Sequence, residues 1–149
     1  MTADQMGMPG TVINALAFRD VIEALGHCSL VMSPGGIPGV AEIYYERRAD
    51  EALGSGYIVE CAGGTGNPLF TTDTAACLRA IELSVDMVIK ATTVDGVYDR
   101  DPVVYPDATR FETVTYEEIL RRRLEVMDAT AIELCESHSK ARRCLRHGG

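Results

Sequence analysis

The chain has 149 residues, of which 46% are hydrophobic and 24% are charged, a composition typical of a globular domain with one sizeable core. Twenty-two acidic residues against 14 basic ones give a net charge of −8, so we expect no nucleic-acid partner, because the chain repels phosphate backbones. It has no apolar run of about 18 residues, so we expect no membrane span.

The cysteines are spaced neither as a zinc site nor as a disulfide framework. No two form a Cys-x-x-Cys pair, and the three histidines do not complete a metal pattern. Residues 1–10 contain no basic residue and no long apolar stretch, so we expect no signal peptide. We predict buried or half-buried free thiols, no metal site and a cytoplasmic location. The cysteines are Cys28, Cys61, Cys77, Cys135 and Cys144.

The first half of the chain alternates between helical and extended patterns. Apolar residues at helical spacing predict a helix over Thr11–Leu25, which Gly26 ends. A short apolar run predicts a strand over Cys28–Met32, and Ala41–Leu53 has the pattern of a second helix with a charged outer face. Another strand is predicted over Tyr57–Ala62.

The alternation continues with a predicted helix over Thr74–Leu83 and a predicted strand over Met87–Ala91. Such alternation favours an α/β fold in which helices cover the faces of a mostly parallel sheet. Ligands of these folds bind at the carboxyl ends of the strands. The two most distinctive loops, residues 63–72 and 92–102, follow predicted strands and are therefore the candidate binding loops.

The last third is less regular. Residues Arg110–Val114 are a strand candidate. Thr115 and Glu118 form a capping box that predicts the start of a helix over Tyr116–Arg122. A final helix is predicted over Ala129–Ser137, with Asp128 as its cap.

Residues 63–73 read GGTGNPLFTTD. The glycines let backbone N–H groups approach a ligand closely, and the helix start that follows favours an anion such as a phosphate. The alternative is an ordinary turn in which Asp73 caps the next helix. No Gly-Lys-Ser/Thr follows, so the segment is not a Walker A loop. Short polar groups suited to a sugar or base edge are supplied by Thr65, Asn67, Thr71 and Thr72.

Residues 90–102 read KATTVDGVYDRDP and contain an Asp-Gly turn. Tyr98 can pack on an adenine ring, and Thr92 and Asp101 can bond its edge or its ribose. The alternative is a surface hairpin with a solvated acidic tip.

Together these segments resemble bacterial UMP kinases, a branch of the amino-acid-kinase superfamily. The resemblance rests on GTGNPLFTTD at residues 64–73, KATTVDGVYDRDP at 90–102 and VMD at 126–128, and it covers residues 2–137. DQMGM at 4–8 and TVINALAFRD at 11–20 match as well. The wider superfamily shares DGVYDRDP, whereas GTGNPLFTTD and DQMGM are typical of UMP kinases.

The resemblance implies a three-layer αβα sandwich of the amino-acid-kinase type. It implies catalytic roles for Asp73, which would organise the transfer centre, and for Asp128. Arg19 and Asp20 match positions linked to allosteric control by GTP, for which the alternative is a solvated helix face. The implied ATP-binding residues are Thr92, Tyr98 and Asp101. The implied UMP-binding residues are Asp4, at the ribose, and Thr65, Gly66, Asn67, Pro68, Leu69, Phe70, Thr71 and Thr72.

Two departures from the family pattern concern charge. UMP kinases begin with a strand that carries a phosphate-binding lysine in a Lys-Leu-Ser-Gly-Glu-type motif, which these 149 residues do not contain. Residues 139–149 include four basic and no acidic residues. We therefore predict a partial amino-acid-kinase domain over 1–138 and a basic tail outside the family over 139–149.

The resemblance implies a cytoplasmic UMP kinase of pyrimidine biosynthesis that converts ATP and UMP to ADP and UDP. ATP would be the phosphate donor and would act together with Mg²⁺. We expect this fragment to be inactive or impaired. The alternative is a non-catalytic nucleotide-binding module or a truncated pseudoenzyme of the same fold. The family further implies a homohexamer, with the helix Thr11–Leu25 at a subunit interface and GTP as an effector.

Overall fold

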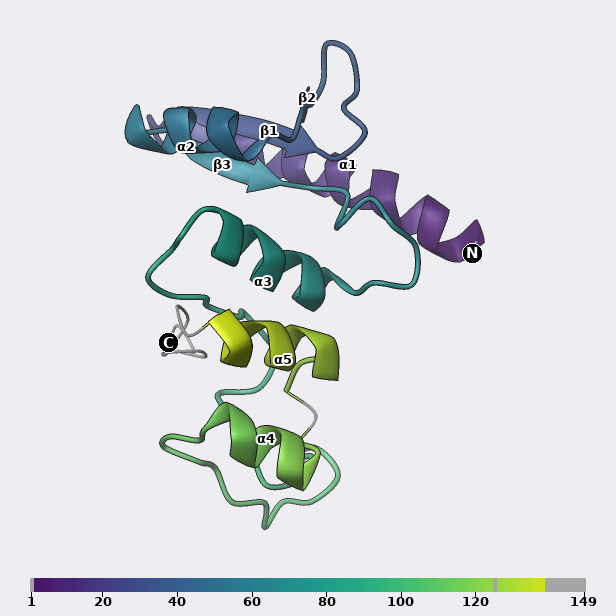
Figure 1. The fold of residues 1–149 in the computed structure, drawn as a ribbon, viewed down its shortest axis with the longest axis vertical. Helices are drawn as coiled ribbons and strands as arrows, with labels where there is room; N and C mark the ends of the chain where they lie inside the picture. The colour runs from purple at the N-terminus through teal and green to yellow at the C-terminus, as the bar shows by residue number, and fades with distance from the viewer. Residues whose placement is uncertain (1, 125, 139–149) are drawn as a thin grey trace. The chain divides into compact units, whose positions relative to one another are not determined.

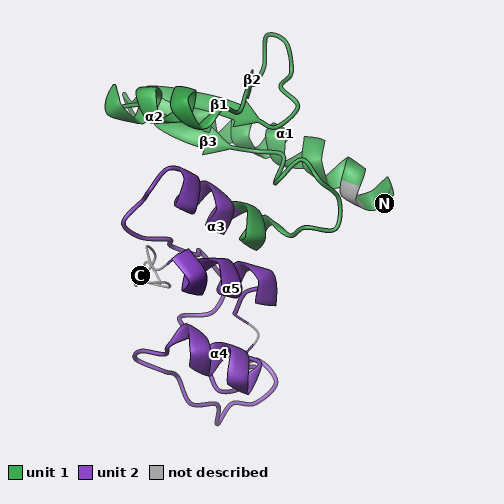
Figure 2. Ribbon diagram, viewed as in Figure 1, with its two compact units in different colours: residues 1–75 green, residues 76–149 purple. Residues whose placement is uncertain are grey.

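The structure is a computed structural model that describes residues 2–124 and 126–138. It divides into two compact units, residues 1–75 and 76–149 (Figure 2).

The first unit contains a three-stranded sheet with the strand order β2-β1-β3 (Figure 1). Both neighbouring pairs are parallel, with Ser29 opposite Ile58 and Met32 opposite Glu42. The predicted α/β class with a parallel sheet is therefore confirmed. The elements are α1 (Thr2–Ala24), β1 (Ser29–Ser33), β2 (Glu42–Ile43), α2 (Glu46–Gly54) and β3 (Ile58–Cys61).

The core of the first unit lies where α1 packs on the sheet. Helix α1 contacts β1 and β3, and α2 contacts β3. The buried side chains are small or β-branched, which lets the helix approach the strands closely: Val12, Val31, Ala41 and Ala62. This packing fixes the position of α1 relative to the carboxyl ends of β1 and β3.

Two predictions for the first unit were wrong in their bounds. Helix α1 begins at Thr2 rather than Thr11 and continues through Pro9, although a proline inside a helix lacks the N–H donor and its ring crowds the carbonyl four residues earlier. The helix predicted over Ala41–Leu53 begins only at Glu46, because Glu42 and Ile43 pair with β1 and the N–H of Tyr44 bonds the carbonyl of Ser33 at 2.9 Å. None of the described helices combines the length and the apolar character that a bilayer crossing requires.

The second unit is built from helices and long connections. Helix α3 (Thr72–Glu82) continues into it from the first unit, and α4 (Tyr116–Arg122) packs against α5 (Ala129–His138). The predicted bounds of α4 are confirmed, and α5 ends one residue later than predicted. One buried cluster joins Cys77 to Ala131 and Cys135, with the two sulfur atoms 3.0 Å apart.

Two predicted strands of this unit do not form within the described residues. Residues Met87–Ala91 lack ladder pairing; Val88 packs against the cluster around Cys77, and Ile89 is 62% exposed. Residues Arg110–Val114 contribute only an isolated antiparallel bridge between Arg110 and Tyr98. An apolar run predicts an extended segment, but a strand also needs a partner along its length.

The thiols depart from the prediction in one respect. Cys77 and Cys135 are buried, as predicted, whereas Cys28 and Cys61 are exposed. Cys61 is the last residue of β3, and Cys28 directly precedes β1, so both lie at strand ends rather than in the core. Cys144 lies outside the described residues.

Candidate functional site

The glycine loop, residues 63–71, connects the carboxyl end of β3 to the start of α3. Gly63 and Gly66 have φ values of +79° and +81°, which glycine adopts without strain. A Cβ at Gly66 would lie 2.7 Å from the Cβ of Pro34, so the loop backbone packs directly on that proline. The loop thus lies at the sheet edge where parallel α/β folds bind ligands.

Two of the predicted UMP-binding residues bond each other. The hydroxyl of Thr65 accepts from the N–H of Asn67 at 3.1 Å and donates to its carbonyl at 3.2 Å. The N–H of Gly66 bonds the carbonyl of Gly63 at 3.2 Å. These bonds make the loop a compact turn whose shape its own side chains determine.

The start of α3 corrects one alternative of the sequence analysis. The hydroxyl of Thr71 accepts from the N–H of Thr74 at 3.2 Å, so Thr71 rather than Asp73 caps the helix. Thr72 is the first helical residue, and Asp73 is half-buried in the first turn. A negative charge at this position is stabilised by the positive end of the helix dipole.

The centre of the loop exposes two apolar side chains. Leu69 is 83% exposed at a φ of +72°, and Phe70 is 54% exposed. Pro68 is half-buried beside them. The same loop therefore contains an exposed aromatic ring, at Phe70, and an exposed amide, at Asn67, two kinds of group that suit a planar heterocycle.

Helix α1 carries the other candidates of the first unit. Asp4 lies in its first turns, and the Asp4 side chain lies outside the described part of the structure. Arg19 and Asp20 face each other at 3.7 Å, with side chains 34% and 75% exposed. Arg19 also lines a shallow depression of about 450 Å³ formed with Glu23 and residues 37–42.

The second unit contains a cavity of about 570 Å³. All three predicted ATP-binding residues line it, namely Thr92, Tyr98 and Asp101. Most of its wall comes from a segment that we call the Asp-Gly loop (residues 92–110), which contributes residues 92–94, 96–102 and 105. The rest of the lining is formed by residues 90, 123, 124 and 126. The cavity is large enough for a nucleoside, since ligand pockets typically measure roughly 300–1,000 Å³.

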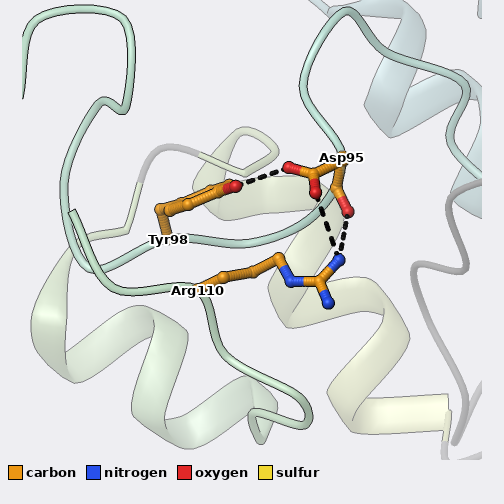
Figure 3. A network of polar contacts seen from close by, with 3 residues as sticks. All are labelled: Asp95, Tyr98 and Arg110. Carbon is orange, nitrogen blue, oxygen red and sulfur yellow. Dashed lines mark hydrogen bonds and ion pairs between the residues drawn. The ribbon is translucent and has the colours of Figure 1, made fainter. Parts of the chain in front are cut away.

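A polar network fixes one wall of this cavity (Figure 3). The Tyr98 hydroxyl donates to the Asp95 carboxylate at 2.5 Å. Arg110 donates to the carbonyl of Asp95 at 3.1 Å and to its carboxylate at 3.3 Å. The hydrogen bond to Asp95, together with partial desolvation, raises the pKa of Tyr98 above its ordinary value.

Other contacts shape the same loop. The carboxylate of Asp101 accepts from the N–H of Val103 at 2.9 Å, which makes Asp101 a turn residue as well as a lining residue. Lys90 donates from Nζ to the carbonyl of Val126 at 2.9 Å and so joins the two ends of the lining. The outer part is held by two bonds between Asp99 and Thr109: the N–H of Asp99 donates to the carbonyl of Thr109 at 3.1 Å, and the Asp99 carboxylate accepts from the N–H of Thr109 at 2.8 Å.

Asp128 holds the start of α5. Its carboxylate accepts from the N–H of Ala131 at 3.1 Å, which confirms the predicted cap. The second predicted cap is also confirmed, because the hydroxyl of Thr115 accepts from the N–H of Glu118 at 3.2 Å.

Sequence reasoning missed three residues that hold these loops. Thr11 bonds the first glycine of the glycine loop, Pro34 packs on it, and Arg110 holds the turn at Asp95. Each acts on a segment at least 15 residues away. A single sequence carries no signal for such long-range contacts.

Comparison with known proteins identifies one family. The model of the amino acid kinase family matches residues 1–145. Similar curated proteins are named uridylate kinase: one from Legionella pneumophila (strain Lens) is 54% identical over 136 residues, and one from Stutzerimonas stutzeri (strain A1501) is 54% identical over 139 residues. These alignments cover 91% and 93% of this chain but 55% and 56% of the relatives, so the chain spans about half their length.

Solved structures of two UMP kinases are similar in fold. The enzyme from Bacillus anthracis has a TM-score of 0.88 at 36% identity, over 92% of this chain and 57% of its own. The enzyme from Ureaplasma parvum has a TM-score of 0.89 at 32% identity, over 98% of this chain and 62% of its own.

Proposed function

The chain belongs to the amino acid kinase family, and on that basis we propose that it carries the nucleotide-binding part of a UMP kinase, which converts ATP and UMP to ADP and UDP in pyrimidine nucleotide biosynthesis. The observation that carries the proposal is the single cavity that Thr92, Tyr98 and Asp101 line together. These are the residues that the resemblance assigns to ATP.

On the ATP side, the contacts separate positioning groups from binding groups. The Tyr98 hydroxyl is bonded to Asp95, so the ring rather than the hydroxyl is the part that packs against adenine. Thr92 is exposed at the cavity and offers a hydroxyl to the base edge or the ribose. The Asp101 carboxylate has acceptor capacity beyond the bond from Val103, and it suits a ribose hydroxyl.

On the UMP side, the glycine loop would bind the acceptor nucleotide. Phe70 offers a ring face for uracil, and Asn67 offers amide groups that pair with its donor and acceptor edge. Asp4 would bond the ribose. A polar site built for one base edge leaves groups unpaired with another base, so the loop should select uracil over cytosine.

Transfer itself needs alignment of the two nucleotides and neutralisation of the phosphoryl charge. We propose that Asp73 and Asp128 orient cationic groups at the transfer centre. Within the described residues, no group of three or more His, Cys, Asp or Glu side chains is arranged to hold a metal ion. We propose that Mg²⁺ would enter with ATP, because this ion keeps several waters and is commonly bound through substrate phosphates.

A second candidate is a nucleotide-binding module that does not catalyse transfer. Its support is the small number of lysines, which are two of the 14 basic residues. One of these, Lys90, is bonded to the carbonyl of Val126 in the cavity wall. Under this proposal the fragment binds both nucleotides and transfers the phosphoryl group slowly or not at all.

We also propose a cytoplasmic homo-oligomer, a hexamer as the family resemblance implies, with α1 at a subunit interface. The support is the row of exposed apolar side chains on α1, which includes Ile13, Phe18 and Val21 at 68%, 68% and 59% exposure. GTP would act as an effector near Arg19, which lines the shallow depression on the same helix.

The test is calorimetric titration of the chain with UMP, CMP and ATP, followed by an assay for UDP. We expect UMP to bind at least about tenfold more tightly than CMP. Formation of UDP supports the kinase, whereas binding of UMP and ATP without UDP supports the module. If the chain binds neither UMP nor ATP, both candidates are contradicted.

A further inference from the structure

A long-range hydrogen bond joins α1 to the glycine loop. The hydroxyl of Thr11 accepts from the N–H of Gly63 at 2.7 Å, across 52 residues of sequence. The same hydroxyl donates to the carbonyl of Met8 at 2.8 Å. Because its proton is directed at Met8, its lone pairs are directed at Gly63, so the hydroxyl has one defined orientation.

The residues around this hydrogen bond are buried or half-buried and hold Thr11 in place. Gly63 is buried, Thr11 is half-buried, and the neighbouring Val12 belongs to the core of α1 and the sheet. Thr11 therefore cannot follow the loop if the loop moves. A hydrogen bond that is shielded from water in this way is costly to leave unmade, because the buried N–H would lack a partner.

A second contact holds the loop from another side. A Cβ on Gly63 would lie 3.1 Å from the Cδ of Pro34, and one on Gly66 would lie 2.7 Å from its Cβ. The N–H of Gly66 in turn bonds the carbonyl of Gly63. The turn from Gly63 to Gly66 is thus held by Pro34 and Thr11, and it contains Thr65, whose hydroxyl bonds the backbone of Asn67.

We propose that Thr11 is a positioning residue for the acceptor nucleotide. The inference rests on the proposed function, in which the glycine loop binds UMP. Thr11 fixes the backbone at Gly63, and this sets where Thr65 and Asn67 present their polar groups. Removing its hydroxyl weakens UMP binding and leaves ATP binding, which uses the second unit, unchanged.

The test compares Thr11→Val, which keeps the shape and removes the hydroxyl, with Thr11→Ser, which keeps the hydroxyl. Thr130→Val is the matched control, because Thr130 is an exposed helical threonine of α5. We expect Thr11→Val to raise the Kd for UMP about fivefold or more and to speed amide exchange at Gly63 about tenfold. For Thr11→Ser and Thr130→Val, the Kd for UMP should stay within about twofold of the parent value. The Kd for ATP should stay within about twofold in all three variants.

Equal UMP affinity in Thr11→Val and the parent overturns the inference, as does a Thr11→Ser variant that is as weak as Thr11→Val. If Thr11→Val fails to fold, the parent chain decides. Its Gly63 amide should exchange at least about tenfold more slowly than the Gly64 amide, for which no hydrogen bond is found among the described residues. Equal rates overturn the inference. A parent that does not bind UMP overturns the proposed function itself.

Discussion

Substitution of Arg110 by methionine should loosen the Asp-Gly loop and weaken ATP binding. Methionine keeps much of the side-chain length and removes the guanidinium that bonds the carbonyl and carboxylate of Asp95. The aliphatic part of Arg110 lies under Gly96, where an added Cβ would be 2.9 Å from its Cδ, so an unbranched replacement preserves this packing.

The magnitude follows from exposure. The side chains of Arg110 and Asp95 are 52% and 58% exposed, so water and salt screen their attraction. An exposed ion pair contributes about 0.2–1 kcal/mol, and the bond to the carbonyl adds about 0.5 kcal/mol, the low end for a net hydrogen bond. A total near 1 kcal/mol corresponds to roughly a fivefold change in an equilibrium constant.

The assay is calorimetric titration with ATP and, separately, UMP at low and at high salt. Arg47→Met is the matched control, because Arg47 forms a comparable exposed ion pair with Glu51, at 3.0 Å, in the first unit. We expect Arg110→Met to raise the Kd for ATP about three- to tenfold, less so at high salt, and to leave the Kd for UMP unchanged. Equal ATP affinity in the two variants would refute a positioning role for Arg110.

Three further predictions concern stability. Gly66→Ala should destabilise the chain in urea more than Gly64→Ala: both place alanine at positive φ, at a cost of about 1–2 kcal/mol, but only Gly66→Ala brings a Cβ to 2.7 Å from Pro34. Because the pKa of Tyr98 is raised in the fold, the Tyr98 bond contributes fully below the unfolded pKa of about 10 and is lost as the pH rises through the folded value. The thermal midpoints of Tyr98→Phe and the parent should therefore converge at high pH; a constant difference contradicts this. Ile132 is 1% exposed, so Ile132→Ala should lower the free energy of unfolding by about 2–5 kcal/mol and Ile132→Val by about 0.5–1.5 kcal/mol. Equal losses for the two variants in urea unfolding would contradict core packing of this side chain.

Local signals predicted the helices of the second unit well. Thr115 directly precedes α4 and caps its start, and Arg123 directly follows it in the left-handed conformation. The capping box at the start of α4 can be read directly from the sequence. The same holds for Asp128 at α5. These boundaries depend on contacts between residues three or four apart, and such contacts can be inferred from a single sequence.

Longer-range features were not predictable in this way. Residues Ala41–Ile43 have helical spacing, yet pairing with β1 makes part of them β2, because tertiary contacts outweigh a weak local preference. The sequence placed Tyr98 and Asp101 in one candidate loop, and the structure places both on one cavity. The role of Arg110 depends on a contact 15 residues away and is visible only in the fold.

The polar groups of both loops bond mainly their own backbone. Thr65 bonds Asn67, Thr71 caps α3, the Tyr98 hydroxyl bonds Asp95, and Asp101 accepts from a backbone N–H. A loop whose side chains already determine its shape loses little further conformational freedom when a ligand binds, so less binding free energy is spent on ordering it. Ring faces and the remaining acceptor sites are then left for the ligand. Changes at the hydroxyls of Thr71 and Tyr98 should therefore act on nucleotide affinity through the shape of the loops, whereas a change at Asp101 should act both on loop shape and on the proposed bond to the ribose.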